Sequence, residues 1–336
     1  MKIHLDTDLG GDIDDLCALA MLINWSGVEL IGVTTVADHR GKRAGYTRYS
    51  LALAGQQDVP VVPGADVALD CYRSTPGLPD EARYWPEPVA SIPGPTERAL
   101  DLLEKSIQEG VTIAAIGPYT NLALLEKRSP GILCRARIYL MGGYIFPPRT
   151  GYPAWDSRMD FNVQVDVESA NLVFQRANVT LVPLSVTIET FLKRAYLVRL
   201  RQSGRLGQLI ARQAEAFAVD LNYEVIYGQT CKGLPKDTIN FQHDPLACAI
   251  ASGWNEGVLI QEVPVKSVIE DGWMKQEIAP GGKLTRVVSA VDGTAFSELW
   301  VDIVTSKSES HAKAQARNAS ALADAGAEQR RKEKGE

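Results

Sequence analysis

Short apolar runs alternate with longer segments of mixed polarity along most of the chain. The short runs are rich in β-branched residues, as buried strands are, and several of the longer segments end at a glycine, as helices do. Strands are predicted at residues 3–5, 30–36, 59–62, 112–116, 138–141, 179–186, 261–268 and 284–291. Helices are predicted at residues 16–23, 44–54, 96–109 and 166–176, as two segments of 187–221 broken near Gly204, and over the apolar stretch that ends at residue 252.

This alternation predicts an α/β fold with an open, mainly parallel central sheet flanked by helices, a Rossmann-like core. Residues 71–95, which hold six of the prolines, are predicted to form a long loop, and residues 222–240 show no clear period. From residue 306 the composition shifts to Ala, Lys, Arg and Glu, with Leu322 as the only bulky apolar residue. We therefore expect one domain over residues 1–305 and a frayed helix or disordered tail over residues 306–336.

The overall composition is that of a soluble globular protein, with 45% hydrophobic and 23% charged residues among 336. The net charge of −6 argues against nucleic acid or an anionic membrane as the main partner. No apolar run is long enough to span a membrane, and the early first strand leaves no room for a signal peptide. The five cysteines are scattered and form no Cys-x-x-Cys pair, so free thiols in a reducing cytoplasm are expected.

Five aspartates fall within the ten residues 6–15, between the first predicted strand and the first predicted helix. Gly10 and Gly11 suit a tight turn there, and open α/β sheets bind ligands where a strand ends and a helix begins. Asp14 and Asp15 are expected at the helix N-terminus, where the helix dipole favours negative charge. Crowded carboxylates take up protons or share a cation, and an all-oxygen donor set favours Ca²⁺ or Mg²⁺ over zinc.

Two plainer interpretations of this stretch are a solvated acidic turn and an EF-hand loop. Acidic loops are common, but they rarely begin inside an apolar strand. Counted from Asp6, the twelfth position is Cys17, so the closing glutamate of an EF-hand is missing.

Further motifs follow later strands, and together they resemble the calcium-dependent nucleoside hydrolases, the inosine-uridine preferring family that cleaves N-ribosides. The family pattern Asp-x-Asp-Pro-Gly-x-Asp-Asp is met by residues 6–15 with Leu9 in place of proline and a turn two residues longer, which adds Asp12. The resemblance extends over about residues 1–305. It also rests on residues 117–123 (Gly-Pro-Tyr-Thr-Asn-Leu-Ala), 141–143 (Met-Gly-Gly), 160–162 (Asp-Phe-Asn) and 243–245 (His-Asp-Pro).

The resemblance implies hydrolysis of the N-glycosidic bond of a ribonucleoside by a Ca²⁺-bound water. It assigns the metal to Asp8, Asp15, the Ile116 carbonyl and Asp244, with Asp8 as the base that takes the water proton. His243 would protonate or hydrogen-bond the leaving base. The residues that would hold the ribose hydroxyls are Asp14, Asp160, Asn162 and Asp244.

Two regions depart from the family pattern. After Thr-Thr-Val the family has a small residue, a glycine and an asparagine or aspartate, whereas this chain has Ala37-Asp38-His39, so His39 is the polar candidate for the sugar site. Tyr223 and Tyr227 would share one helical face, in a region that helps to cover the base in the family, although two tyrosines at this spacing more often serve ordinary packing. The long loop lacks the histidine of many members, and its Arg73, Tyr84 and Trp85 are candidates to reach a ligand or to form a surface cover.

Two rival functions remain open from the sequence. One is a nucleoside- or sugar-binding protein that keeps the carboxylates and has little or no turnover. The other is a phosphatase with Asp6 as its nucleophile, although the downstream Ser or Thr and Lys stations of such enzymes are missing at recognisable spacing. The resemblance also implies that the protein binds a small-molecule nucleoside. It further implies assembly into a homodimer or homotetramer.

Overall fold

The computed structural model describes residues 1–70, 72–73 and 77–306. Most of the predicted tail, residues 307–336, and part of the predicted long loop, residue 71 and residues 74–76, lie outside the described residues. Within the described ranges, no helix combines the length and apolar character needed to cross a membrane.

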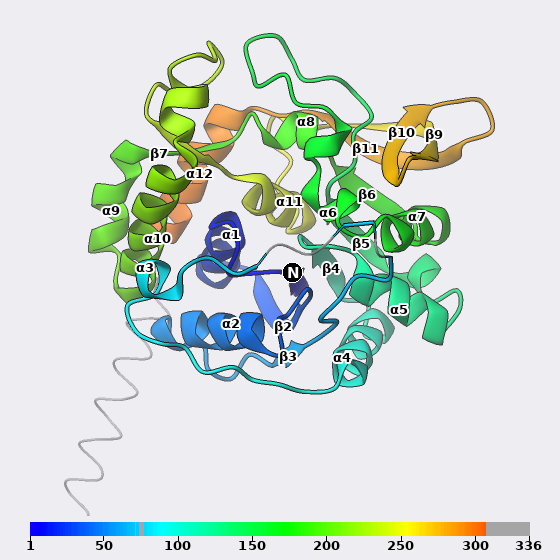
Figure 1. Ribbon diagram of the computed structural model, residues 1–336, viewed down its shortest axis with the longest axis horizontal. Coiled ribbons are helices and arrows are strands. Elements are labelled where there is room, and N and C mark those ends of the chain that lie inside the picture. The colour runs from blue at the N-terminus through cyan, green and yellow to red at the C-terminus, as the bar shows by residue number, and fades with distance from the viewer. Residues whose placement is uncertain (71, 74–76, 307–336) are drawn as a thin grey trace, which may run out of the picture.

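A nine-stranded sheet forms the centre of the molecule, in the order β10-β9-β11-β6-β5-β4-β1-β2-β3 (Figure 1). Neighbouring strands from β3 to β11 run parallel, and β9 and β10 are antiparallel additions at one edge. The prediction of a mainly parallel open sheet is therefore confirmed. The strands are β1 (Lys2–Thr7), β2 (Glu29–Thr35), β3 (Val61–Pro63), β4 (Thr112–Ala115), β5 (Arg137–Met141), β6 (Val179–Val182), β9 (Leu259–Glu270), β10 (Trp273–Ile278) and β11 (Lys283–Ala290).

Helices cover both faces of this sheet, as the two buried apolar clusters show. One cluster joins the sheet to α1, α2, α10, α11 and α12, and the other joins it to α4, α5 and α7. Neighbouring residues of one strand serve opposite faces, since Ala114 belongs to the first cluster and Ile113 to the second. The helices are α1 (Asp14–Asn24), α2 (Lys42–Leu53), α3 (Glu81–Tyr84), α4 (Thr96–Gln108), α5 (Thr120–Arg128), α6 (Phe161–Gln164), α7 (Val167–Arg176), α8 (Leu184–Thr187), α9 (Leu197–Gln202), α10 (Arg205–Leu221), α11 (His243–Ala251) and α12 (Gly293–Thr305).

Several predicted bounds are wrong in the second half of the chain. The predicted strand 179–186 ends at Val182, because Pro183 starts the short helix α8. The first of the two helices predicted in 187–221 gives way to a strand, β7 (Phe191–Lys193), although the break at Gly204 between α9 and α10 is confirmed. The helix α3 lies inside the predicted long loop, and α5, β8 (Thr238–Phe241) and β10 were not predicted.

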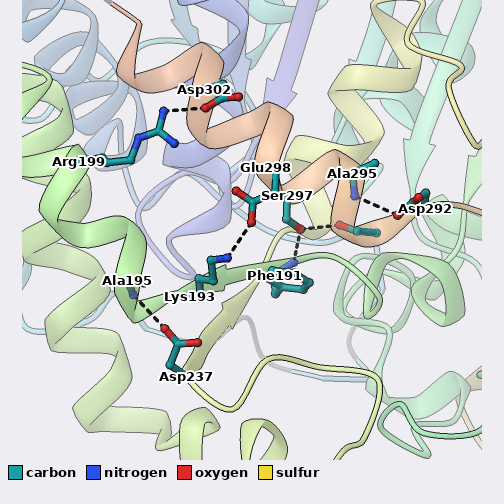
Figure 2. Close-up of polar contacts among 11 residues, drawn as sticks. Phe191, Lys193, Ala195, Arg199, Asp237, Asp292, Ala295, Ser297, Glu298 and Asp302 are labelled. Carbon is teal, nitrogen blue, oxygen red and sulfur yellow. Dashed lines mark hydrogen bonds and ion pairs between the residues drawn. The ribbon is translucent and has the colours of Figure 1, made fainter.

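The C-terminal helix α12 fastens the small second sheet, in which β7 and β8 pair antiparallel. Figure 2 shows Lys193 of β7 in an ion pair with Glu298 of α12, at 2.7 Å, and the Phe191 amide donating to Ser297 Oγ at 2.9 Å. Asp292 caps α12 by accepting from the Ala295 amide. Because β8 leads directly into α11, these contacts fix the strand that precedes His243.

Candidate active site

The carboxyl ends of β1, β4 and β5 open into a cavity of about 480 Å³. Asp8 follows β1, Ile116 follows β4 and Met141 ends β5, and all three line the cavity. The N-termini of α1 and α11 point into it with Asp14 and Asp244 in their first turns. The site therefore lies where the sequence predicts it, at the strand-to-helix crossings of a parallel sheet.

The turn between β1 and α1 is held in shape from α2. Gly10 has a φ of +110°, and a Cβ there would lie 2.5 Å from the Tyr46 ring, so only glycine fits. Arg43 of α2 is buried and donates its guanidinium hydrogens to the backbone carbonyls of Asp8 and Ala37. The two-residue extension of this turn is thus a packed structure and not a loose insertion.

Three buried carboxylates meet at one end of the cavity. Oxygen atoms of Asp14, Asp15 and Asp244 lie within 4.8 Å of one another. Burial, followed by the charges of neighbouring aspartates, raises the pKa of all three well above its usual value. This excludes the solvated acidic turn, and such a group of oxygen donors without a paired cation fits a hard divalent ion such as Ca²⁺.

The remaining predicted metal ligands border this group. Asp8 lines the same cavity, 3.9 Å from the Arg43 guanidinium, and burial raises its pKa while Arg43 lowers it. Ile116 also lines the cavity, and its carbonyl accepts a hydrogen bond from the Asn162 amide at 2.8 Å. The tight group thus contains Asp14, which the resemblance assigned to the sugar, in the place expected for Asp8.

His243 stands beside this cluster at the start of α11. Its Nδ1 lies 2.7 Å from Thr187 Oγ1, and the same hydroxyl donates to the Leu184 carbonyl at 3.2 Å. The Thr187 hydroxyl can donate to either group, so its contact with His243 Nδ1 is compatible with both tautomers of the neutral ring. Burial lowers the pKa of His243 to about 3, which keeps the imidazole neutral.

Apolar and aromatic side chains line the rest of the cavity. Tyr223 lines it, whereas Tyr227 packs behind, with ring centroids 5.1 Å apart and the Tyr227 hydroxyl accepting from Trp155 Nε1 at 2.9 Å. The two tyrosines therefore lie together, as their spacing predicts, but only the first reaches the cavity. The aromatic residues of this wall are Tyr84, Trp155, Phe161, Phe217 and Tyr223.

Two residues predicted to hold the sugar do not line the cavity. Asp160 is buried, and its carboxylate accepts from the backbone amides of Gly143 at 2.6 Å and of Val163 at 3.3 Å, which caps α6. His39 lies outside the lining residues in a left-handed conformation with φ of 51°. The direct contacts that the resemblance assigned to Asp160 and His39 are therefore not supported by the positions of their side chains.

Of the three candidates in the long loop, Arg73 and Trp85 have packing roles, and only Tyr84 reaches the cavity. Trp85 stacks on Tyr46 with ring centroids 4.2 Å apart, and Arg73 stacks on Trp273, so neither reaches the cavity. Tyr84 does line the cavity, and its hydroxyl donates to Asp220 Oδ2 at 2.7 Å.

Asp6 cannot serve as a phosphatase nucleophile. It is fully buried, does not line the cavity and accepts hydrogen bonds from Thr34 Oγ1 at 2.5 Å and from Asn121 Nδ2 at 2.8 Å. Asn121 belongs to the Thr-Asn-Leu-Ala motif, so these bonds tie that motif to β1. The structure gives Asp6 a structural position.

Several cavity residues were not singled out from the sequence, among them Arg43, Phe217 and Asp220. Arg43 follows no motif, since its contact with Asp8 spans 35 residues and depends on how α2 packs against β1. Phe217 and Asp220 lie on the last turn of α10, directly before Tyr223. Their position just before Tyr223 in the sequence is the signal that would have identified Phe217 and Asp220.

The fold and the cavity together define an α/β protein with a small-molecule site at the carboxyl edge of its sheet. The model of the inosine-uridine preferring nucleoside hydrolases matches residues 3–326. The chain belongs to this family, whose members hydrolyse ribonucleosides.

Relatives and solved structures agree with that membership. The chain is 30% identical over 265 residues to the pyrimidine-specific ribonucleoside hydrolase RihA of Citrobacter koseri, which covers 75% of this chain and 78% of that protein. It is 31% identical over 232 residues to uridine nucleosidase 1 of Arabidopsis thaliana, which covers 62% of this chain and 64% of that protein. A purine-preferring ribonucleoside hydrolase from Gardnerella vaginalis shares the fold, with a TM-score of 0.73 at 21% identity over 92% of this chain and 99% of that chain.

Proposed function

We propose that this chain is a Ca²⁺-dependent hydrolase of ribonucleosides that releases the free base and ribose. The observation that carries the proposal is one cavity lined by both buried carboxylates and aromatic side chains. A ribose with vicinal hydroxyls suits the carboxylates, and a flat nucleobase suits the aromatic side chains.

The residues that would hold Ca²⁺ are Asp8, Asp15, Asp244 and the Ile116 carbonyl, with Asp14 close enough to join them. When bound, the ion supplies a positive charge that lowers the pKa of a water and binds ribose hydroxyls. The burial of these carboxylates supports this role, because an uncompensated cluster of like charges is costly in a dry site.

Asp8 is the proposed general base. It borders the carboxylate group and faces the cavity, and the nearby Arg43 favours its ionised form. Asp8 would take a proton from the attacking water. That water would attack the anomeric carbon on the face opposite the nucleobase, through an oxocarbenium-like state.

Asp14, Asp244 and Asn162 are the proposed ribose contacts, since all three line the cavity beside the carboxylate group. Asp160 supports them indirectly, because it holds the Gly143 amide and the first turn of α6, which carries Asn162.

His243 is proposed to hydrogen-bond the leaving base. Because its ring is neutral, His243 suits a hydrogen bond to the leaving base better than full transfer of a proton from an imidazolium. The charge that develops on the leaving base would then be carried by other contacts or by solvent.

The test is release of reducing sugar from a panel of ribonucleosides, with and without Ca²⁺. Uridine is the first substrate to try and inosine the second, because relatives are named for pyrimidine and purine ribonucleosides. Turnover of at least one ribonucleoside supports the proposal. Tight binding of ribonucleosides without any turnover would instead support the rival binding protein.

We also propose a cytoplasmic homodimer or homotetramer. The four cysteines within the described residues are free thiols, which suits a reducing compartment. Several large apolar side chains are exposed, among them Val219 at 73% and Leu284 at 64%, which suits contact between subunits. Light scattering during size-exclusion chromatography tests the assembly, and a single-chain mass would refute it.

A further inference from the structure

We infer that Asp12 determines substrate specificity by accepting a hydrogen bond from the exocyclic amino group of a nucleobase. The inference rests on the proposed function and names the favoured substrate class, ribonucleosides of aminated bases such as adenosine and cytidine. It concerns the carboxylate that the longer turn adds, for which the family pattern has no counterpart.

Asp12 is held in place by a residue far away in the chain. Asn240 of β8 donates its Nδ2 hydrogen to Asp12 Oδ1 at 2.7 Å, across 228 residues. Asn240 is fully buried, and its own Oδ1 has no hydrogen-bond partner among the described residues. Asn240 thus donates to Asp12 although its own side-chain oxygen finds no donor among the described residues. This indicates that the hydrogen bond to Asp12 sets the position of the Asn240 side chain.

The turn supports the same placement from the other side. Gly10 packs on Tyr46, and Gly11 lies beside the Arg43 guanidinium, so α2 fixes the two residues directly before Asp12. Asp12 is therefore held by a hydrogen bond from β8, and the turn before it is held by α2, while Asp12 still lines the cavity. A loose surface carboxylate would need neither support.

Asp12 lines the cavity together with the other carboxylates and with Tyr223. Asp14 is two residues away in the sequence, and Asn240, which donates to Asp12, is followed by Phe241, whose ring is 5.6 Å from that of Tyr223. Burial raises the pKa of the Tyr223 hydroxyl, and the Asp12 carboxylate is the next cause. Asp12 and Tyr223 line the same cavity, so a base that lies against Tyr223 shares that cavity with the Asp12 carboxylate.

A metal role suits Asp12 less well. Asp12 lies outside the group formed by Asp14, Asp15 and Asp244, and its Oδ1 already accepts from the side-chain amide of Asn240 and the backbone amide of Ile13. A carboxylate at the edge of a base pairs well with an amino group, which offers two donors. The ring N–H of uracil is a poorer partner, because a carboxylate that approaches it meets a carbonyl oxygen on each side, and the ring N–H of hypoxanthine has one carbonyl oxygen beside it.

The test compares substrates that differ only by the amino group: adenosine against purine riboside, and cytidine against pyrimidin-2-one riboside. For the wild type we expect the aminated member of each pair to be favoured about ten- to a hundredfold in kcat/KM and in affinity. Asp12→Asn should reduce that preference to within about threefold while it retains Ca²⁺. Asp302→Asn, at a surface ion pair with Arg199, is the matched control and should keep the wild-type ratio.

Equal values for both members of each pair in the wild type, or an unchanged preference in Asp12→Asn, would overturn the inference. Loss of Ca²⁺ from Asp12→Asn in a calorimetric titration would also overturn it, because Asp12 would then be a metal ligand. If Asp12→Asn does not fold, Asn240→Ser replaces it, and an unchanged preference in that variant counts against the inference. An amino preference in affinity without any ribose release would uphold Asp12 and refute the proposed hydrolysis, so the two failures are distinguishable.

Discussion

The Asn162 side-chain amide donates a hydrogen bond to the Ile116 carbonyl at 2.8 Å, and it also reaches the Met141 carbonyl at 3.1 Å. One amide thus ties α6 to the ends of two adjacent strands. The Ile116 carbonyl is the proposed backbone ligand of Ca²⁺, so Asn162 would orient that ligand as well as contact ribose.

Asn162→Ala should therefore weaken Ca²⁺ binding about 10- to 100-fold and lower activity on ribosides more than on 2′- or 3′-deoxy analogues. Calorimetric Ca²⁺ titration and steady-state rates on matched substrates measure the two effects. Asn171→Ala, on the partly exposed face of α7, is the control. Unaltered Ca²⁺ affinity would show that Asn162 does not orient the metal ligand.

Asp8→Asn separates proton transfer from metal binding. The amide keeps the size of the side chain and one oxygen but removes its basicity, so turnover should fall about 10²–10⁴-fold. Ca²⁺ should still bind, and a ribose analogue should still bind. Near-normal turnover with Ca²⁺ present would assign the base role to another carboxylate.

Ca²⁺ removal should destabilise the fold. A ligand that binds only the folded chain adds about 2.7 kcal/mol at a concentration 100 times its Kd, so chelation should lower Tm and added Ca²⁺ should restore it. Asp15→Ala should lose metal and activity together, and excess Ca²⁺ should partly recover both. Thermal melts and elemental analysis measure these effects, and a Tm insensitive to chelator would contradict them.

Tyr223 and Tyr227 offer a matched pair of substitutions. Tyr223→Leu removes an aromatic face from the cavity and should raise KM about tenfold, since aromatic contacts contribute about 0.5–1.5 kcal/mol beyond burial. Tyr227→Phe removes only the acceptor of the Trp155 indole hydrogen and should change KM little. Equal effects of the two substitutions on KM would mean that the base does not contact Tyr223 directly.

His4 should make stability depend on pH. Its ring is fully buried, lies 2.8 Å from Ser106 Oγ and 3.1 Å from Thr34 Oγ1, and burial lowers its pKa to about 3. The unfolded chain takes up this proton below a pH of about 6.5, whereas the folded chain does so only near 3. The stabilisation by neutral His4 is therefore complete above 6.5 and is lost as the pH falls, by up to about 1.4 kcal/mol per pH unit.

The measurement for His4 is urea unfolding of the wild type and His4→Gln between pH 4 and pH 7. The variant cannot titrate, so the difference between the two stability curves should shrink steadily as the pH falls. A difference that stays constant over this range would contradict the lowered pKa of His4.

The site near β1 was predictable because its chemistry is local in sequence. Asp8, Asp14 and Asp15 belong to one strand-turn-helix unit, and the position of that unit in a parallel sheet follows from alternation alone. The His243-Asp244 pair was placed by the resemblance, and the structure brings Asp244 to the same end of the cavity as Asp15.

The parts that were not predicted depend on contacts between distant segments. The strands β7 and β8 are three and four residues long, and they form a sheet only because they meet each other. Arg43 lines the cavity because α2 packs beside the turn after β1, and no local sequence pattern predicts that packing. Asp160 looked like a sugar contact from its motif, but two backbone amides use its carboxylate.

The Asp244 amide donates to Asp14 Oδ2 at 3.3 Å, and this contact spans 230 residues. During synthesis the acidic turn leaves the ribosome early, together with β1 and β2, which pair directly. Its carboxylates therefore remain exposed to solvent until α11 and the strand before it have emerged. A nascent chain that stops before β8 would therefore expose the acidic turn without its contact from Asp244, and the carboxylate group is complete only once α11 has been made.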